Sequence, residues 1–352
     1  MTDKTTSRPY PPSWVDRLTD WIEGLPIPIW AFYLISYLII SVLLNLAAWF
    51  NNARPWGEFS FVQFYSAIWW PLVLIVIHNT DRLAHHALDR FAPLLRSKKS
   101  QLAEIRYQMT TMPARTVLWI SIIAVAILTA SAIQDPGLVI TELPPGPIHP
   151  VTWMIAGFIG IGSYSLAPVM IYHAIRQLNL ATKAYAMVDE VNIFHQQPLY
   201  SFSGLTMRTA LFLVSMVYIT YAGEAIYDPS AGEEAVNLVL SIVIIPLSIL
   251  IVLLPLLGIH QRLADAKGNV LEENSMQLEK TQNKLYAALD KDKYAESDSL
   301  DRGLSSLYKV RDELKSLPTW PWAAGAFRNF LSAVLLPMLL WAAQIFLSRF
   351  LG

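Results

Sequence analysis

The sequence predicts an all-α, polytopic membrane protein with seven transmembrane helices, its N-terminus inside the cell and its C-terminus outside. Three observations support this class. Hydrophobic residues make up 54% of the 352 residues and charged residues only 15%, whereas soluble domains carry about 25% charged residues. Seven apolar stretches are long enough to cross a hydrocarbon core of about 30 Å. Basic residues are concentrated in alternate connections between these stretches, as is typical of membrane proteins.

Residues 1–26 are expected to form a cytoplasmic, amphipathic helix at the membrane interface. Ser13 follows two prolines and precedes Asp16 by three residues, which is the spacing of a helix N-cap and its reciprocal partner. The apolar side chains of 13–25 share one helical face: Trp14, Leu18, Trp21, Ile22 and Leu25. We expect this face to lie in the headgroup layer and to lead into the first span.

The apolar stretches define the bundle and its last span. They are 27–50, 60–78, 116–134, 151–173, 207–226, 237–259 and 328–349. We therefore expect a six-span bundle over 27–259, a cytoplasmic helical hairpin over 260–322, and a seventh transmembrane helix within 323–352. The second and third stretches are the shortest, so a count of six spans stays open.

The distribution of basic residues predicts the orientation. The segments 1–26, 79–115, 173–208 and 259–328 together hold 24 of the 26 Lys and Arg residues. The opposite side has only Arg54 and Arg349, together with seven acidic residues. The positive-inside rule places the basic segments in the cytoplasm.

Most of the chain outside the membrane is expected to be helical and cytoplasmic. Helical extensions are expected at 79–115 and 174–206. Within the hairpin, leucines recur every seven residues at Leu271, Leu278 and Leu285, which gives half of a coiled-coil seam. A second apolar series lies at Leu300, Leu304, Leu307, Val310, Leu314 and Leu317. We expect these half-seams to pack on other cytoplasmic helices or on neighbouring subunits.

The spans lack the residues that membrane chemistry usually requires. Their central segments contain no Asp, Glu, Lys, Arg or His, although proton pumps and ion-coupled transporters normally carry at least one such residue. The chain has no cysteine and none of the common hydrolase, metalloprotease, nucleotide-binding or dinucleotide-binding motifs. We therefore predict no enzyme activity, no catalytic or metal-binding residue, no cofactor and no nucleic-acid partner.

A few polar and small residues within the spans are candidates for specific roles. Gln344 in the last span is a large amide, and we name Gln344 and Ser332 as candidate pore-lining residues. Ala156 and Gly160 have the small-xxx-small spacing that allows a neighbouring helix to approach closely. Other polar side chains in the spans are expected mainly to form hydrogen bonds between helices.

Histidines lie at the inner ends of the three spans that run inward, each followed by an arginine. The residues of this candidate inner-face ring are His78, His173, His260, Arg82, Arg176 and Arg262. The simplest interpretation is anchoring to anionic headgroups. A pH-responsive ring is the sharper alternative. Asp81, His85 and Asp89 follow at helical spacing, so a divalent-metal site is a further, weaker alternative.

These features favour a homo-oligomeric ion channel or channel-type receptor of the plasma membrane, with membrane lipids and copies of itself as partners. The order of elements resembles the layout of insect-type chemoreceptor channels, with Gln344-Ile345-Phe346 as the nearest approach to a shared motif. The resemblance is one of layout and assigns no role to any residue.

Two other functions stay open at this point. The hairpin could recruit a cytoplasmic protein partner, which would make the chain a membrane scaffold or assembly protein. The protein could also transport a neutral or apolar solute, although the spans show no inverted repeat.

Overall fold

The computed structural model describes residues 8–95, 98–140, 142, 146–189, 191–227, 235–322, 325–336 and 339. This part of the chain is nearly all helical and contains no strand. Helices suit a lipid environment because each helix satisfies its own backbone hydrogen bonds.

Within the described residues, six helical segments are long and apolar enough to cross a membrane. They are Ile29–Phe50, Phe61–Leu95, Ala114–Gln134, Pro150–Ala186, Gln197–Thr220 and Pro246–Leu289. A shorter apolar helix, Ala326–Leu336, is the described part of the expected seventh span. Most of that span lies outside the described residues, so the seventh crossing and the orientation stay predictions.

The N-terminal helix α1 (Trp14–Glu23) confirms the expected capping pattern. The Asp16 backbone N–H donates to Ser13 Oγ at 3.2 Å, and the Ser13 backbone N–H donates to an Asp16 carboxylate oxygen at 2.7 Å. The apolar face is divided in a way that the sequence did not predict. Ile22 is fully buried against the bundle, whereas Trp21 is 54% exposed.

The first two spans differ in regularity. Helix α2 (Ile29–Phe50) is continuous, whereas the second span consists of α3 (Phe61–Ser66) and α4 (Trp69–Phe91). Pro71 explains the break at 67–68, because proline lacks a backbone N–H and its ring clashes with the carbonyl of residue 67. Helix α4 continues past residue 78, where the apolar stretch ends, to Phe91, as expected for a helical extension of the span.

A short 3₁₀ turn, η1 (Ala92–Leu95), separates α4 from α5 (Lys99–Thr110). Helix α6 (Ala114–Gln134) forms the third span. A second 3₁₀ turn, η2 (Pro136–Leu138), follows it.

The fourth span begins with α7 (Pro150–Thr152) and a π-helical turn, η3 (Trp153–Gly157). It continues as α8 (Phe158–Ala186), which contains Pro168. A 3₁₀ turn, η4 (Gln197–Tyr200), then leads into α9 (Ser201–Tyr227).

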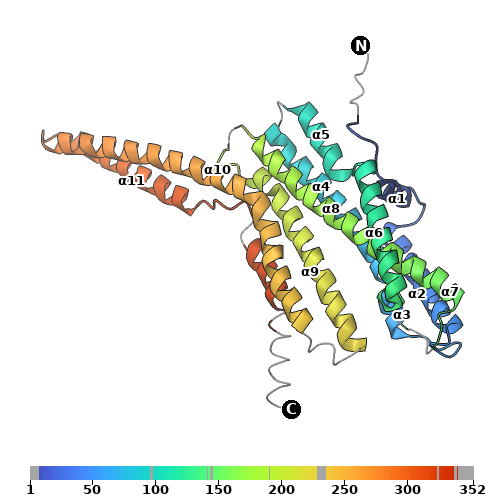
Figure 1. The fold of residues 1–352 in the computed structure, drawn as a ribbon. Helices are drawn as coiled ribbons and strands as arrows, with labels where there is room; N and C mark the ends of the chain where they lie inside the picture. The colour runs from blue at the N-terminus through green and yellow to red at the C-terminus, as the bar shows by residue number, and fades with distance from the viewer. Residues whose placement is uncertain are drawn as a thin grey trace, which may run out of the picture.

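Helix α10 (Ala235–Leu289) continues without interruption for 55 residues and includes Pro246 and Pro255. Its last part leaves the bundle, and α11 (Tyr294–Ser316) returns antiparallel along it (Figure 1). We call the pair formed by residues 263–289 of α10 and by α11 the arm.

Helix α4 lies at the centre of the bundle and packs against both α8 and α9, while α10 packs against α8 and α9. The largest core cluster includes Phe91, Tyr185 and Phe202. By contrast, α2 and α6 expose large apolar side chains such as Leu38 and Ile127. These two helices therefore present surfaces that suit contact with lipid.

The two ends of the bundle differ (Figure 1). Helices α1 and α5 and the base of the arm lie at one end, which we call the α1 end, whereas α3 and α7 lie at the opposite α3 end. The described parts of the four basic segments lie at the α1 end. The structure contains no membrane that would assign this end to a compartment.

Candidate functional site

The polar residues of the α1 end are held in place by a contact between two loop segments. The chain before α1 pairs with the chain before α6: Ser13 N–H donates to the Met112 carbonyl at 3.0 Å, and Ala114 N–H donates to the Pro11 carbonyl at 3.1 Å. An isolated bridge between Pro12 and Pro113 lies between these bonds. The N-terminal segment is therefore fastened to the bundle along its backbone.

Asp16 joins the same two segments through its side chain. The carboxylate oxygen that accepts from Ser13 also accepts from the Met112 backbone N–H at 2.9 Å. Asp16 is 5% exposed, and its other oxygen has no hydrogen-bond partner among the described residues. Burial raises the pKa of the Asp16 carboxyl above its ordinary value, and this effect outweighs the hydrogen bonds, which lower it.

Arg176 of α8 belongs to this contact. It donates to the Thr111 carbonyl at 2.6 Å and to the Tyr10 hydroxyl. The Tyr10 hydroxyl in turn donates to the same carbonyl at 2.9 Å. Burial raises the pKa of the Tyr10 hydroxyl above its ordinary value. Of the predicted ring residues, Arg176 thus anchors the N-terminal segment to the fourth span.

Asp81 and His173 form the centre of a polar cluster between α4 and α8. His173 Nε2 lies 2.7 Å from Asp81 Oδ1, and Gln177 Nε2 donates to the same oxygen at 3.0 Å. Gln177 also donates to the Met109 carbonyl at 3.0 Å. His173 and Gln177 are each 1% exposed. This cluster links α4, α8 and the end of α5.

His78 lies one helical turn before Asp81 on α4. Its Nε2 is 2.9 Å from Glu23 Oε1, close enough for an ion pair although not aligned as a hydrogen bond. Its Nδ1 is 3.4 Å from the Tyr33 hydroxyl. His78 therefore connects the end of α1 with α2 and α4.

A polar cavity of about 400 Å³ lies among these elements. Four carboxylates line it, from Asp16, Asp20, Glu23 and Asp81, together with Arg8 and Arg82. The cavity is large enough for a small polar group and carries both signs of charge. Among the described residues, no three His, Asp or Glu side chains are grouped so that they could hold a metal ion.

The residues proposed for the alternative metal site divide between two sets of partners. Asp81 pairs with His173, whereas His85 Nδ1 lies 3.2 Å from Asp89. Arg106 of α5 donates to Asp89 at 2.6 Å. These contacts fasten α5 to α4.

His260 and Arg262 make their contacts elsewhere. The His260 ring stacks on Trp320 at 3.9 Å, and its Nδ1 lies 3.1 Å from the Thr319 carbonyl. Arg262 donates to the Tyr185 carbonyl at 2.9 Å and to carbonyls just beyond the end of α8. A cation at the C-terminal end of a helix is stabilised by the helix dipole. The six ring residues are thus shared between the N-terminal contacts and the base of the arm, and Arg82 remains exposed.

A second polar cluster lies at the α3 end, around Glu142. Its carboxylate accepts from Arg54 at 3.1 Å, from the Ser60 hydroxyl at 2.7 Å and from Gln63 at 3.2 Å. The Glu142 side chain is only 9% exposed. The paired carboxylate raises the pKa of Arg54.

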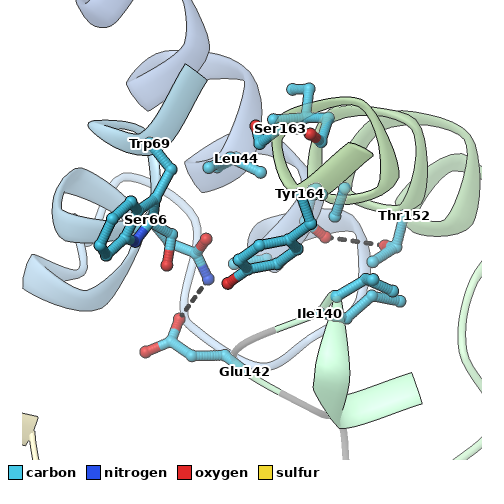
Figure 2. A pocket seen from close by; sticks show the side chains of 15 residues that line it. Leu44, Ser66, Trp69, Ile140, Glu142, Thr152, Ser163 and Tyr164 are labelled. Carbon is cyan, nitrogen blue, oxygen red and sulfur yellow. Dashed lines mark hydrogen bonds between the residues drawn. The ribbon is translucent and has the colours of Figure 1, made fainter. Parts of the chain in front are cut away.

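The Glu142 carboxylate borders a cavity of about 20 Å³, enclosed by Trp69, Thr152 and Tyr164 (Figure 2). This volume has room for a water molecule. The cluster lies where the segment before α3 and Gln63 of α3 meet the loop that carries Glu142, and this small cavity has no room for a larger ligand.

The remaining predicted residues have the following positions. Ala156 is buried among Leu44 and Ala47 of α2. At Gly160 a Cβ atom would lie 2.8 Å from the Val139 carbonyl, so the close approach is made by the segment after η2. Ser332 is exposed. Gln344 lies outside the described residues, so the pore remains a prediction.

Several residues of these clusters were missed by reasoning from the sequence. Asp81 was considered only for metal binding, Gln177 and Tyr10 were not considered, and Glu142 was counted only as an outer charge. Apart from the contact of Gln177 with His173, their partners lie 68 to 166 residues away, so local patterns do not indicate them. For Gln177, the one local signal is its position one turn after His173.

Comparison with known protein families, with curated proteins and with solved structures finds no match to this chain. The six long apolar helices fit a multi-pass membrane protein.

Proposed function

We propose that this protein is a membrane-embedded assembly protein that presents its arm to a protein partner. The observation that carries the proposal is the arm itself, which extends from the bundle at the α1 end (Figure 1). Because α10 is continuous from the span into the arm, the arm is a direct extension of a transmembrane helix.

Within the arm, the apolar faces of α10 and α11 pack against each other. Leu278 and Ala288 of α10 and Leu314 of α11 are each less than 10% exposed, and Asn274 donates to the Leu307 carbonyl at 3.3 Å. The half-seams pack on each other, and near the base of the arm Leu271, Leu314 and Leu317 also join the largest core cluster, as expected for packing on other helices. Packing on neighbouring subunits stays a prediction. The outer faces of the arm stay free for other contacts.

The base of the arm is fixed to the bundle. Lys267 of α10 donates to the Lys315 and Leu317 carbonyls at 2.7 Å each, across the two helices. Beyond α11, Trp320 stacks on His260, Trp322 stacks on Trp320 at 4.6 Å, and Phe327 stacks on Trp322 at 4.8 Å. These contacts hold the arm where it meets the bundle.

The tip of the arm exposes three large side chains. Tyr286, Leu289 and Tyr294 are 55%, 44% and 67% exposed. Tyrosine is enriched at the energetic centres of protein interfaces because it combines a large apolar ring with a hydroxyl. Three large exposed side chains at one end of an otherwise charged hairpin offer a contact for a protein partner.

The test is to purify the full chain from its native membranes and measure the mass of the assembly by light scattering. We expect a bound partner polypeptide with the unchanged chain. The triple variant Tyr286→Ser, Leu289→Ser and Tyr294→Ser should lose it. The matched control, Met276→Ser with Tyr308→Ser on the shaft of the arm, should keep it. A partner retained by the tip variant, or no partner with the unchanged chain, contradicts the proposal.

Reconstitution of the purified chain in liposomes separates this proposal from the homo-oligomeric channel expected from the sequence. An assembly protein leaves the liposomes tight to ions. Ion flux that is altered by Gln344→Ala would favour the channel instead.

A further inference from the structure

A long groove separates α2 from α4 on the surface of the bundle. Its volume is about 650 Å³, within the range of roughly 300–1,000 Å³ that is usual for ligand sites. Trp30, Tyr33 and Tyr37 line one wall, at the spacing of a single face of α2. Leu72 and Ile75 of α4 line the other wall.

The α4 wall changes from apolar to polar along its length. Leu72 and Ile75 are followed on the same face by Asn79 and then Arg82. The helix rises by about 15 Å over the ten steps from Leu72 to Arg82, which matches half of a hydrocarbon core of about 30 Å. Set in a bilayer, this part of the groove would match the depth of one leaflet, with Asn79 and Arg82 at its polar end.

Arg82 is available to a ligand at the polar end. It is exposed, and within the described part of the chain it makes no hydrogen bond or ion pair. A guanidinium group matches phosphate oxygens in geometry and charge. Asn79 is also exposed and offers an amide donor three residues earlier on the same face.

The groove borders the polar cavity of the α1 end. His78 and Arg82 line both spaces, so the two meet at these residues. Beyond Arg82, the cavity presents the Asp20 and Glu23 carboxylates. Glu23 is already paired with His78, whereas Asp20 is exposed. A ligand seated in the groove therefore meets a cation first and carboxylates next.

The geometry points to a site for a zwitterionic phospholipid with a primary ammonium group, taken from the leaflet at the α1 end. One acyl chain lies between the aromatic wall of α2 and the Leu72–Ile75 wall. The phosphate binds Arg82 and Asn79, and the ammonium reaches the carboxylates of Asp20 and Glu23. The order of charges along the site matches the order of charges in this class of lipid.

The test uses the delipidated full chain in detergent and native mass spectrometry. The probes are phosphatidylethanolamine, phosphatidylcholine and phosphatidylglycerol with identical acyl chains. We expect phosphatidylethanolamine to bind most tightly. Arg82→Gln should weaken its binding at least about tenfold, because charge-assisted hydrogen bonds to phosphate are lost. Leu72→Trp, which fills the groove, should also abolish it.

The matched control is Arg90→Gln, which removes an exposed arginine from α4 outside the groove. It should bind the lipid as the unchanged chain does. Asp20→Asn combined with Glu23→Gln should remove the preference for the ammonium headgroup while keeping phosphate-dependent binding. Equal binding by the Arg82 and Arg90 variants, or a preference of the unchanged chain for phosphatidylglycerol or phosphatidylcholine, overturns the inference. The Arg82 change is on the surface, so it reports on binding even if Leu72→Trp fails to fold.

Discussion

Single side chains fasten the N-terminal helix to the bundle, and Asp16 does so from a buried position. Its carboxylate accepts from the backbone of both segments that meet there. Burial raises its pKa in the folded chain, whereas the unfolded chain exposes the group to water. The folded state therefore binds this proton more tightly than the unfolded state does.

This difference predicts a pH dependence of stability. The contribution of Asp16 is fully present below its ordinary pKa and is lost as the pH rises through the raised value. Asp16→Asn cannot ionise, so it should remove this part of the fall in melting temperature with rising pH. The exposed Asp20→Asn is the matched control and should retain the slope. Identical pH profiles for the two variants would contradict this account of Asp16.

Gly160 tests the packing at the α3 end. A methyl group there would meet the Val139 carbonyl at 2.8 Å, so Gly160→Ala should destabilise the protein by about 1–3 kcal/mol through overpacking. Gly258→Ala on α10 meets nothing within 4 Å and should be neutral or slightly stabilising. Thermal unfolding followed by tryptophan fluorescence measures both, and equal shifts would show that the predicted contact is absent.

At the scale of elements, the arm contains one unfavourable group. Asn274 lies in the seam at 7% exposure, and its side-chain oxygen has no hydrogen-bond partner among the described residues. A buried acceptor without a partner costs about 1–3 kcal/mol. The arm is therefore less stable at this point than an apolar seam would be.

Asn274→Leu should stabilise the arm by roughly 1 kcal/mol, because it replaces this amide by an apolar side chain of similar size. Hydrogen exchange of the full chain should then slow across residues 263–316. Asn283→Leu on the exposed face is the control and should leave the exchange unchanged. Faster exchange in the Asn274 variant would mean that the amide is needed to align the two helices.

The elements could be predicted from the sequence where local patterns determine them. Apolar length indicates six described spans, and the Ser13–Asp16 spacing indicates the start of α1, because both depend on neighbouring residues. The partner of His173 could not be predicted, because Asp81 lies 92 residues away. The groove between α2 and α4 could not be predicted either, because it depends on how these two helices are placed relative to each other in space.

At the scale of the whole molecule, the two ends have different characters. The α1 end combines the basic segments, the polar cavity and the arm, whereas the α3 end holds the Glu142 cluster. The positive-inside rule predicts that the α1 end faces the cytoplasm. A cytoplasmic partner for the arm depends on this orientation.

The seventh span is a separate prediction, which concerns the side of the membrane on which residue 352 lies. If the last helix crosses the membrane, Gly352→Cys should react with a membrane-impermeant maleimide from outside intact cells. Protection of this residue until the cells are permeabilised would leave the chain with an even number of crossings.

The most direct test of the account is the position of the arm relative to the membrane. The chain contains no cysteine, so single cysteines can be introduced without removing others. We predict that Glu58→Cys at the α3 end is labelled by the impermeant maleimide in intact cells, and that Lys291→Cys at the arm tip is labelled only after permeabilisation. Labelling of Lys291→Cys in intact cells would place the arm outside and contradict both the orientation and the proposed cytoplasmic partner.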